Sequence, residues 1–324
     1  MKRIGMLYDG IWHWDTLRVA FHLARKGSRH SRDVVSFEKN LDRNLRHLQG
    51  EIRSERVCLA GFTQFVIHDP KERTITAPGF RDRVLHHAIM QVSEPFFDRW
   101  LISDSYACRK GKGRLAALQR ATGFARQHGW FLKLDIRKYF ESIPQERLLV
   151  ALARKFKDHR LLGLFEQILR SHPKGLPIGS LTSQHWANFY LGSVDRLVKE
   201  HLRIPGYVRY MDDFVLWDND PNRLKHAWSV IEHHVVTQLG LELKAGSNLN
   251  RCSHGMDFCG FRVFPGWRIL NRRSLRRFSA SLKSLQHVED ERIQQTRGQA
   301  LIAFASEGHT WHQRKRALAR ATTA

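Results

Sequence analysis

The sequence predicts an α+β fold in which antiparallel strands pack with helices. Residues 207–210 and 214–217 are rich in β-branched and aromatic side chains, which favour extended backbone, and a tight turn at Met211-Asp212 joins them. Residues 34–49 place apolar side chains at helical spacing with charges between them (Phe37, Leu41, Leu45, Leu48). Strands joined by short turns, together with separate amphipathic helices, are typical of this fold class.

The other elements are predicted from similar patterns. β-branched runs on either side of Asp69-Pro70 predict a strand, a turn and a strand at residues 65–68, 69–72 and 73–76. Further strands are expected at 131–134 and, as a hairpin, at 256–263 and 267–270. Helices are expected over residues 14–27, 34–49, 78–98, 114–128, 183–202 and 221–239, as two helices within 146–170, and beyond residue 271.

Three carboxylates stand where predicted strands end. Asp212 and Asp213 lie at the hairpin turn, and Asp135 follows the strand at 131–134, shortly before a helix start marked by Pro144. Neighbouring carboxylates repel each other unless a cation lies between them, and Mg²⁺ prefers carboxylate oxygen. If the two strands are neighbours in one sheet, the acids form the arrangement that two-metal phosphoryl transfer requires. For the turn alone, a solvated acidic turn is the alternative.

These motifs resemble those of reverse transcriptases. Tyr210-Met211-Asp212-Asp213 resembles the catalytic loop of that family, and Asp135 with Phe140 resembles its first catalytic motif. Residues 175–184 read Gly-Leu-Pro-Ile-Gly-Ser-Leu-Thr-Ser-Gln, with Ile178 where most reverse transcriptases related to group II introns carry Gln. In this form the block resembles the reverse transcriptases of diversity-generating retroelements.

The resemblance runs over roughly residues 15–280 and implies a right-hand polymerase with fingers, an antiparallel-sheet palm and a helical thumb. It implies a helical N-terminal extension at 1–60, fingers with part of the palm at 61–130, the palm with the catalytic motifs and primer grip at 131–270, and a helical thumb with a basic tail at 271–324. The end from Arg314 onward is expected to be partly disordered. Residues after about 285 are too few for an RNase H, endonuclease or maturase extension, so nicking or priming is expected to come from elsewhere.

The resemblance also implies roles for individual residues. Asp135, Asp212 and Asp213 would be catalytic and, with the backbone of Ile136, would hold two Mg²⁺ ions. The residues implied to contact the deoxynucleotide are Arg109, Lys112, Lys138, Tyr139, the steric-gate ring of Phe140, Ile178 and Gly179, and those of the primer grip are Phe258, Cys259 and Gly260. On the residues alone, a flexible basic loop is the alternative for 105–114, and a core aromatic is the favoured interpretation of Phe140.

Two positions bear on how such an enzyme would work. Ile178 offers no hydrogen bond where relatives place Gln, and loss of a polar contact weakens discrimination between base pairs. Low fidelity is therefore expected, especially opposite template adenine, as the family implies. Relatives also carry a Lys, thought to protonate pyrophosphate, at the position of Ser247; the nearest Lys here is Lys244, which leaves the general acid unassigned.

The composition predicts a polyanionic partner. Lys and Arg number 54 against 31 Asp and Glu, a net charge of +23. No apolar run approaches about 18 residues, and neither a lipidation signal nor a signal peptide is present, so we expect a cytoplasmic protein of a bacterium, archaeon or phage. The implied partners are a structured template RNA, the RNA/cDNA duplex, deoxynucleoside triphosphates and a small, basic, pentameric accessory variability protein, with no membrane.

Several alternatives remain at this stage. Cys252, His254 and Cys259 lie close in sequence, but a fourth zinc ligand at suitable spacing is missing, so ordinary thiols are favoured. A retron-like or group II-derived reverse transcriptase is the main enzymatic alternative; an RNA-dependent RNA polymerase would be favoured by a small residue in place of Phe140. A non-catalytic, basic RNA-binding scaffold is disfavoured by the complete acidic triad, because buried acids without a metal are costly.

Overall fold

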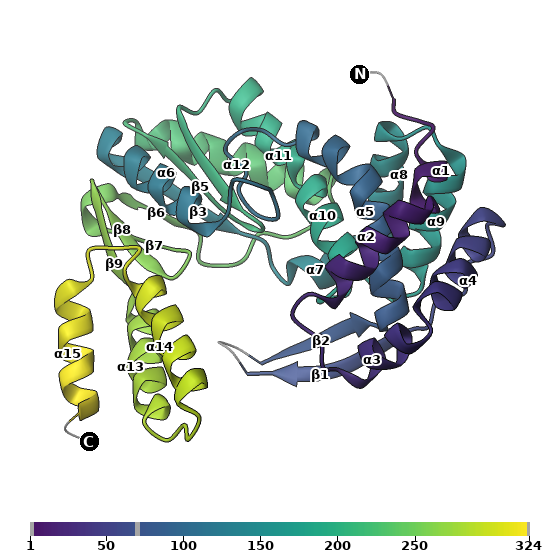
Figure 1. The fold of residues 1–324 in the computed structure, drawn as a ribbon. Helices are drawn as coiled ribbons and strands as arrows, with labels where there is room; N and C mark the ends of the chain where they lie inside the picture. Colours follow the sequence, from purple (N-terminus) through teal and green to yellow (C-terminus); the bar gives the residue numbers. More distant parts are fainter. Residues whose placement is uncertain (1–2, 69–71, 323–324) are drawn as a thin grey trace. The chain divides into compact units, whose positions relative to one another are not determined.

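A computed structural model of the chain describes residues 3–68 and 72–322, so most of the turn predicted at 69–72 lies outside the described residues. The chain divides into two compact units (Figure 1). The first comprises Met1–Ile102, Ile136–Asp195 and Glu232–Leu243, and the second comprises Ser103–Asp135, Arg196–Ile231 and Lys244–Ala324. None of the described helices is both long and apolar enough to cross a membrane.

The first unit is mainly helical. It begins with α1 (Tyr8–Ile11), α2 (Trp14–Arg25), α3 (Arg32–Lys39) and α4 (Leu41–Arg53). The antiparallel hairpin of β1 (Phe62–Ile67) and β2 (Arg73–Pro78) leads into α5 (Phe80–Trp100), against which α2 packs. The remaining helices are α7 (Tyr139–Ser142), α8 (Gln145–Lys155), α9 (His159–Arg170), α10 (Leu181–Tyr190) and α11 (Gly192–Arg196).

The structure divides two helices that the sequence pattern predicted as continuous. Residues 34–49 break at Asn40, whose φ of −126° and ψ of 45° are not helical. Asn favours such breaks because its side chain competes for backbone hydrogen bonds. Residues 183–202 form α10, α11 and one π-helical turn at Leu197–His201. At Gly192 a β-carbon would lie 2.6 Å from the indole nitrogen of Trp100, so this interruption falls where the chain passes the end of α5.

The second unit is built on a four-stranded antiparallel sheet in the order β4-β5-β3-β6. Its strands are β3 (Trp130–Asp135), β4 (Gly206–Tyr210), β5 (Asp213–Asp218) and β6 (Asn248–Arg251). α6 (Arg114–Gln127) packs on it, with Phe124 stacked on Trp217 at 5.5 Å between ring centroids. Residues Phe214–Trp217 are completely buried, so β5 is covered on both faces. α12 (Pro221–Thr237) follows β5 and runs from the second unit into the first.

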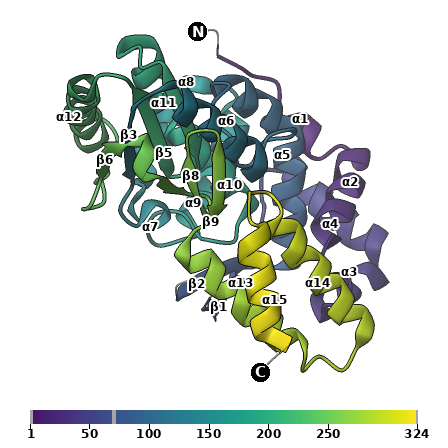
Figure 2. The ribbon, with the colours of Figure 1, turned by 90° about the vertical axis from the view of Figure 1, so that its left-hand side faces the viewer.

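A smaller antiparallel sheet and three helices complete the second unit (Figure 2). The sheet has the order β7 (Met256–Phe258), β8 (Phe261–Phe264), β9 (Trp267–Leu270), which adds a strand to the expected hairpin. The helices are α13 (Arg272–Leu285), α14 (Glu291–Ala305) and α15 (Trp311–Thr322). The predicted α+β class is confirmed.

The expectation of disorder beyond Arg314 is wrong for most of that segment. α15 extends to Thr322 and packs on α13. Ala317 and Ala321, four residues apart on one helix face, are buried, and the side-chain amide of Gln286 donates to the carbonyl of Ala321 at 2.8 Å. Small apolar residues at helical spacing let this basic helix pack on α13, although its charge suggested a solvated tail.

Gly206 lets β4 approach its neighbours closely. A β-carbon there would lie 2.7 Å from Cβ of Trp217 and 3.2 Å from the ring of Phe124. We expect Gly206→Ala to lower the free energy of unfolding by about 1–3 kcal/mol, because the packed neighbours must shift. Gly123→Ala in α6 is the control: nothing lies within 4 Å of its β-carbon position, and we expect stabilisation of about 0.5–1 kcal/mol there. Urea denaturation measures both, and equal stabilities would contradict this account.

Candidate active site

The β4–β5 hairpin carries two of the predicted carboxylates. Tyr210 is paired with Asp213, so Met211-Asp212 forms the turn, as the sequence predicted. Met211 has a φ of 59°, in the left-handed region that residues other than glycine rarely occupy. Its carbonyl accepts a hydrogen bond at 3.0 Å from the guanidinium of Arg209, which is completely buried. A buried cation therefore holds the turn in its unusual conformation.

The third carboxylate lies across from this hairpin. β3 and β5 are antiparallel neighbours, and their register pairs Asp135 directly with Asp213. The structure thus brings together two acids that are far apart in the sequence. Residues paired in this way have β-carbons about 4.5–5.5 Å apart, and like charges at such positions destabilise a sheet. The pairing requires compensating positive charge.

Two lysines supply that charge. Nζ of Lys133 lies 3.0 Å from Oδ2 of Asp213, and Nζ of Lys244 lies 3.2 Å from Oδ2 of Asp135. Lys244 also donates its backbone N–H to the carbonyl of Asp135 at 2.8 Å. Lys133 was not among the residues predicted for the site from the sequence pattern. The signal was present, since Lys133 and Asp135 are two residues apart in a strand and so share a face.

The surroundings of Asp213 disfavour the ionised form of its carboxyl group. Burial is the main cause that raises its pKa to about 6; the ammonium of Lys133 acts against this rise, and the charges of Asp135 and Asp212 add to it. The side chain is 27% exposed, yet its Oδ1 atom is buried and has no hydrogen-bond partner among the residues that the structure describes. A buried oxygen of this kind costs free energy unless a donor or a cation reaches it.

The donor chemistry of this cluster fits a divalent cation. Carboxylate oxygens are the ligands that Mg²⁺ prefers, and Oδ1 of Asp213 lacks a partner. Over residues 3–68 and 72–322, however, no group of three or more His, Cys, Asp and Glu side chains is close enough to hold a metal ion. The lysines contact Oδ2 of Asp135 and of Asp213, which leaves Oδ1 of Asp213 as the carboxylate oxygen without a partner among the described residues.

The basic loop that precedes α6 belongs to the same unit as the carboxylates. The N–H of Tyr106 donates to the carbonyl of Arg209 at 3.0 Å, which ties the loop to β4. Arg109 and Lys112 donate to backbone carbonyls of the loop at 2.8 and 3.0 Å. The two predicted phosphate-binding cations therefore have defined positions.

Other predicted nucleotide contacts lie in the first unit. Tyr139 is buried and its hydroxyl donates to the carbonyl of Ala187 at 2.5 Å, so its side chain supports the fold. Phe140 is partly exposed and meets the Tyr139 ring edge-on at 5.9 Å. The carbonyl of Phe140 accepts a hydrogen bond at 2.8 Å from the N–H of Leu176, which joins it to the segment that contains Ile178.

Close backbone approaches hold that segment in place. A β-carbon at Gly175 would lie 2.4 Å from the carbonyl oxygen of Phe140, and one at Gly179 would lie 2.9 Å from a β2 side chain. The carbonyl of Ile178 accepts a hydrogen bond at 2.8 Å from a backbone N–H of β2. The segment is therefore fixed to the β1–β2 hairpin and to Phe140.

Ile136 and Lys138 follow β3 directly in the chain. Ile136 is buried and forms an antiparallel bridge with Leu243. Lys138 has a φ of 46° and lies 3.5 Å from Glu141 in an exposed ion pair. Through this left-handed residue the chain passes from β3, which ends at Asp135, to α7.

The predicted primer-grip residues form the β7–β8 turn. Cys259 and Gly260 have φ values of 47° and 88° and lie between the paired residues Phe258 and Phe261. Positive φ at both central residues is the mark of a type I′ turn, which matches the twist of the flanking strands. Phe258 is buried in the core of the unit, so core packing fixes the strand residue that precedes the turn.

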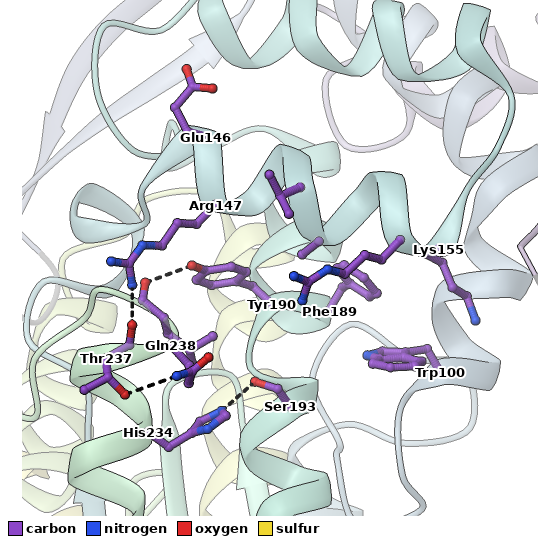
Figure 3. Close-up of a pocket in the computed structure, with 14 residues that line it drawn as sticks. Trp100, Glu146, Arg147, Lys155, Phe189, Tyr190, Ser193, His234, Thr237 and Gln238 are labelled. Atoms are coloured by element: carbon purple, nitrogen blue, oxygen red, sulfur yellow. Dashed lines mark hydrogen bonds between the residues drawn. The ribbon is translucent and has the colours of Figure 1, made fainter. Parts of the chain in front are cut away.

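A separate cavity of about 720 Å³ lies in the first unit, lined by α8, the end of α10 and the C-terminal end of α12 (Figure 3). Its walls are held by internal hydrogen bonds: the Tyr190 hydroxyl donates to the carbonyl of Leu239 at 2.8 Å, and Arg147 donates to that of Thr237 at 3.0 Å. Its described lining includes none of the predicted site residues.

Comparison with solved structures defines the class of fold. The chain is similar to telomerase from Candida albicans in complex with a TWJ fragment of telomeric RNA, with a TM-score of 0.52 and 10% identity over 71% of this chain and 51% of that one. Apo telomerase from Candida tropicalis gives a TM-score of 0.52 and 10% identity, over 70% and 53%. The fold is that of a right-hand polymerase.

Residues 68–261 match the family described as reverse transcriptase (RNA-dependent DNA polymerase). The match covers more than half of the chain, which therefore belongs to the reverse transcriptase family.

The curated relatives include proteins of group II introns. Nuclear intron maturase 1 of Arabidopsis thaliana is 26% identical over 38% of this chain and 17% of its own length, and the group II intron-encoded protein LtrA of Lactococcus lactis is 26% identical over 40% and 23%. Protein YkfC of Escherichia coli is 22% identical over 63% and 65%. The chain thus spans less than a quarter of the length of the intron proteins.

The four cysteines are free thiols in different surroundings, which predicts unequal reactivity. Burial raises the pKa of Cys252 to about 12 and raises that of Cys259 strongly, whereas Cys58 is exposed. Because the thiolate is the nucleophile, we expect Cys252 and Cys259 to be alkylated by iodoacetamide at least about 100-fold more slowly than Cys58 at neutral pH. Mass spectrometry of timed samples measures this, and similar rates for Cys58 and Cys259 would contradict the raised pKa of the partly buried Cys259.

Proposed function

We propose that this protein is an RNA-directed DNA polymerase that copies a template RNA into cDNA by two-metal nucleotidyl transfer. The observation that carries the proposal is the cross-strand pair of Asp135 and Asp213 beside the Asp212 turn, in a chain of the reverse transcriptase family. Phosphoryl-type transfer depends on positioning and on neutralisation of developing charge. A carboxylate cluster at the end of a rigid sheet suits both requirements.

In this proposal, Asp135, Asp212 and Asp213, with the backbone carbonyl of Ile136, hold two Mg²⁺ ions. The bound metal supplies activation of the primer 3′-hydroxyl and stabilisation of the pyrophosphate leaving group. Lys244, whose ammonium contacts Asp135, is our candidate for the group that gives a proton to pyrophosphate, a role that Ser247 does not suit.

In this proposal, several side chains and backbone groups contact the incoming nucleotide. Arg109 and Lys112 offer cations to the triphosphate from the loop anchored on β4. The ring of Phe140 lies below the sugar, where it excludes a 2′-hydroxyl and selects deoxynucleotides. The backbone of Lys138 and Tyr139 faces the phosphates, and Ile178 with Gly179 lies beside the base pair.

We assign the subdomains accordingly. Residues 1–60 form a helical extension, 61–130 the fingers with the β1–β2 hairpin, 131–270 the palm with the carboxylates, and 271–324 the thumb. The exposed arginines on α13 suit the phosphate backbone of an RNA/cDNA duplex. The net charge of +23 supports the same kind of partner.

Within this family we propose an error-prone enzyme of a diversity-generating retroelement. Ile178 supports this, because its side chain cannot donate or accept a hydrogen bond beside the base pair. The proposal implies a structured template RNA and a basic, pentameric accessory variability protein. A group II intron-type reverse transcriptase or maturase is the second candidate, favoured by the similarity to LtrA and to the plant maturase; a maturase role need not be catalytic.

The carboxylates provide the direct test of the polymerase. We expect Asp135→Ala and Asp212→Ala each to lower primer extension by at least about 10³-fold, because each removes a metal ligand. RNA binding, measured by fluorescence anisotropy, should stay within a few-fold of wild type. Asp15→Ala on α2, whose side chain is 82% exposed, is the control and should extend normally. Retained extension in either site variant would refute the metal assignment.

The identity of residue 178 provides the test of the subtype. On an RNA template with Mg²⁺, we expect sequencing of the cDNA to show errors concentrated opposite adenine. Ile178→Gln should lower that error frequency by about 10-fold or more, since a polar contact to the base pair is restored. An unchanged error spectrum in Ile178→Gln would contradict the proposal of an error-prone retroelement enzyme and favour the group II-type alternative.

A further inference from the structure

Lys133 makes two contacts that join the two sheets of the second unit. Its ammonium lies 3.0 Å from Oδ2 of Asp213 at the end of the four-stranded sheet. The same nitrogen donates to the backbone carbonyl of Asp257, in β7 of the smaller sheet, at 2.5 Å. The side chain is 24% exposed, and its bond to the Asp257 carbonyl lies on the solvent-exposed side.

The register of the smaller sheet explains why the Asp257 carbonyl is available. Phe258 and Phe261 flank the two-residue turn, and Asp257 is paired with Arg262 one step further on. In such a hairpin the flanking pair exchanges both hydrogen bonds, and the next pair directs its backbone groups away from the partner strand. β7 is the edge strand of this sheet, so the carbonyl of Asp257 points outward, where Lys133 meets it.

Asp257 is joined to the β7–β8 turn by a short, well-fixed stretch of chain. Phe258 is buried, and Cys259 and Gly260 are fixed in the left-handed conformation of a type I′ turn. Only one residue separates the carbonyl held by Lys133 from Cys259. A shift of β7 at Asp257 therefore moves the turn with it.

We propose that Lys133 is a positioning residue that fixes the Phe258–Gly260 turn relative to the carboxylate of Asp213. This rests on the proposed function, in which the turn holds the primer end and Asp213 holds a metal ion. One ammonium provides three donors, so it serves an anion and a carbonyl simultaneously. By holding Oδ2, Lys133 also fixes the orientation of Oδ1, the buried oxygen that lacks a protein partner in the described chain.

The role predicts a specific kinetic defect. Misplacement of reacting groups by about 1 Å lowers the rate of a reaction by roughly 10²-fold. Lys133→Met keeps most of the length of the side chain but removes both contacts, so we expect the rate constant of nucleotide addition to fall by about 10²-fold. The KM for deoxynucleotide and the Kd for primer–template duplex should stay within about threefold of wild type, since Lys133 lies among none of the residues proposed to bind the nucleotide.

The experiment compares Lys133→Met with Lys133→Arg and with Lys225→Met, an exposed α12 lysine of the same unit. Single-turnover primer extension gives the rate constant and KM, and anisotropy gives the duplex Kd. Lys133→Arg, which keeps a cation with several donors, should recover at least about tenfold of the loss, and Lys225→Met should behave as wild type. An unchanged rate constant in Lys133→Met, or a loss confined to KM or Kd, would overturn the proposal.

Hydrogen exchange of the metal-free protein provides a readout that does not depend on activity. Lys133→Met should speed amide exchange at residues 257–262 and leave α6 unchanged. If wild type shows no extension on any template, the proposed function fails, whereas unchanged exchange at 257–262 overturns the Lys133 link itself. If Lys133→Met does not fold, Lys133→Leu, which also removes both contacts, replaces it in both measurements, and the same outcomes decide.

Discussion

The second unit depends on compensation of the repulsion between two acids that its strand pairing brings together. Antiparallel pairing of β3 with β5 sets Asp135 against Asp213, a placement that repels and that an ordinary sheet avoids. Lys133 and Lys244 each neutralise one of the two acids, and buried Arg209 holds the Met211-Asp212 turn beside them. Oδ1 of Asp213 is still buried without a partner among the described residues, so the protein carries an electrostatic cost that a bound cation would relieve.

Rigid surroundings keep these charges from moving apart. β5 is buried on both faces, and Gly206 allows β4 to approach Trp217 closely. The basic loop with Arg109 is bonded to β4 through Tyr106, and the β7 strand is bonded to β3 through Lys133. Cations, carboxylates and the tight β7–β8 turn are thus all fixed to one sheet, which suits a reaction that depends on positioning more than on covalent chemistry by the protein.

Much of the fold was predictable because it is encoded locally. The β4–β5 hairpin, its turn at Met211-Asp212 and the β3 strand follow from β-branched and aromatic runs, and most helices from apolar periodicity. The errors arose where apolar periodicity or charge alone did not decide the structure. Asn40 interrupts a helix whose periodicity continues past the break, Trp100 packs against Gly192, and α15 is seated by Ala317 and Ala321 although its charge suggested a solvated tail.

For the site, the sequence by itself singled out the acids to which we assign the chemistry in our proposal and, through the match of residues 68–261, determined the reverse transcriptase family. Residue identity and spacing suffice for that, because strand ends and turns are local features. Only the tertiary structure decided that Asp135 faces Asp213, that Lys133 and Lys244 neutralise them, and that Lys133 reaches the carbonyl of Asp257. Lys133 and Asp257 are 124 residues apart and lie in two different sheets, so no local preference fixes their contact. The packing of the folded second unit does.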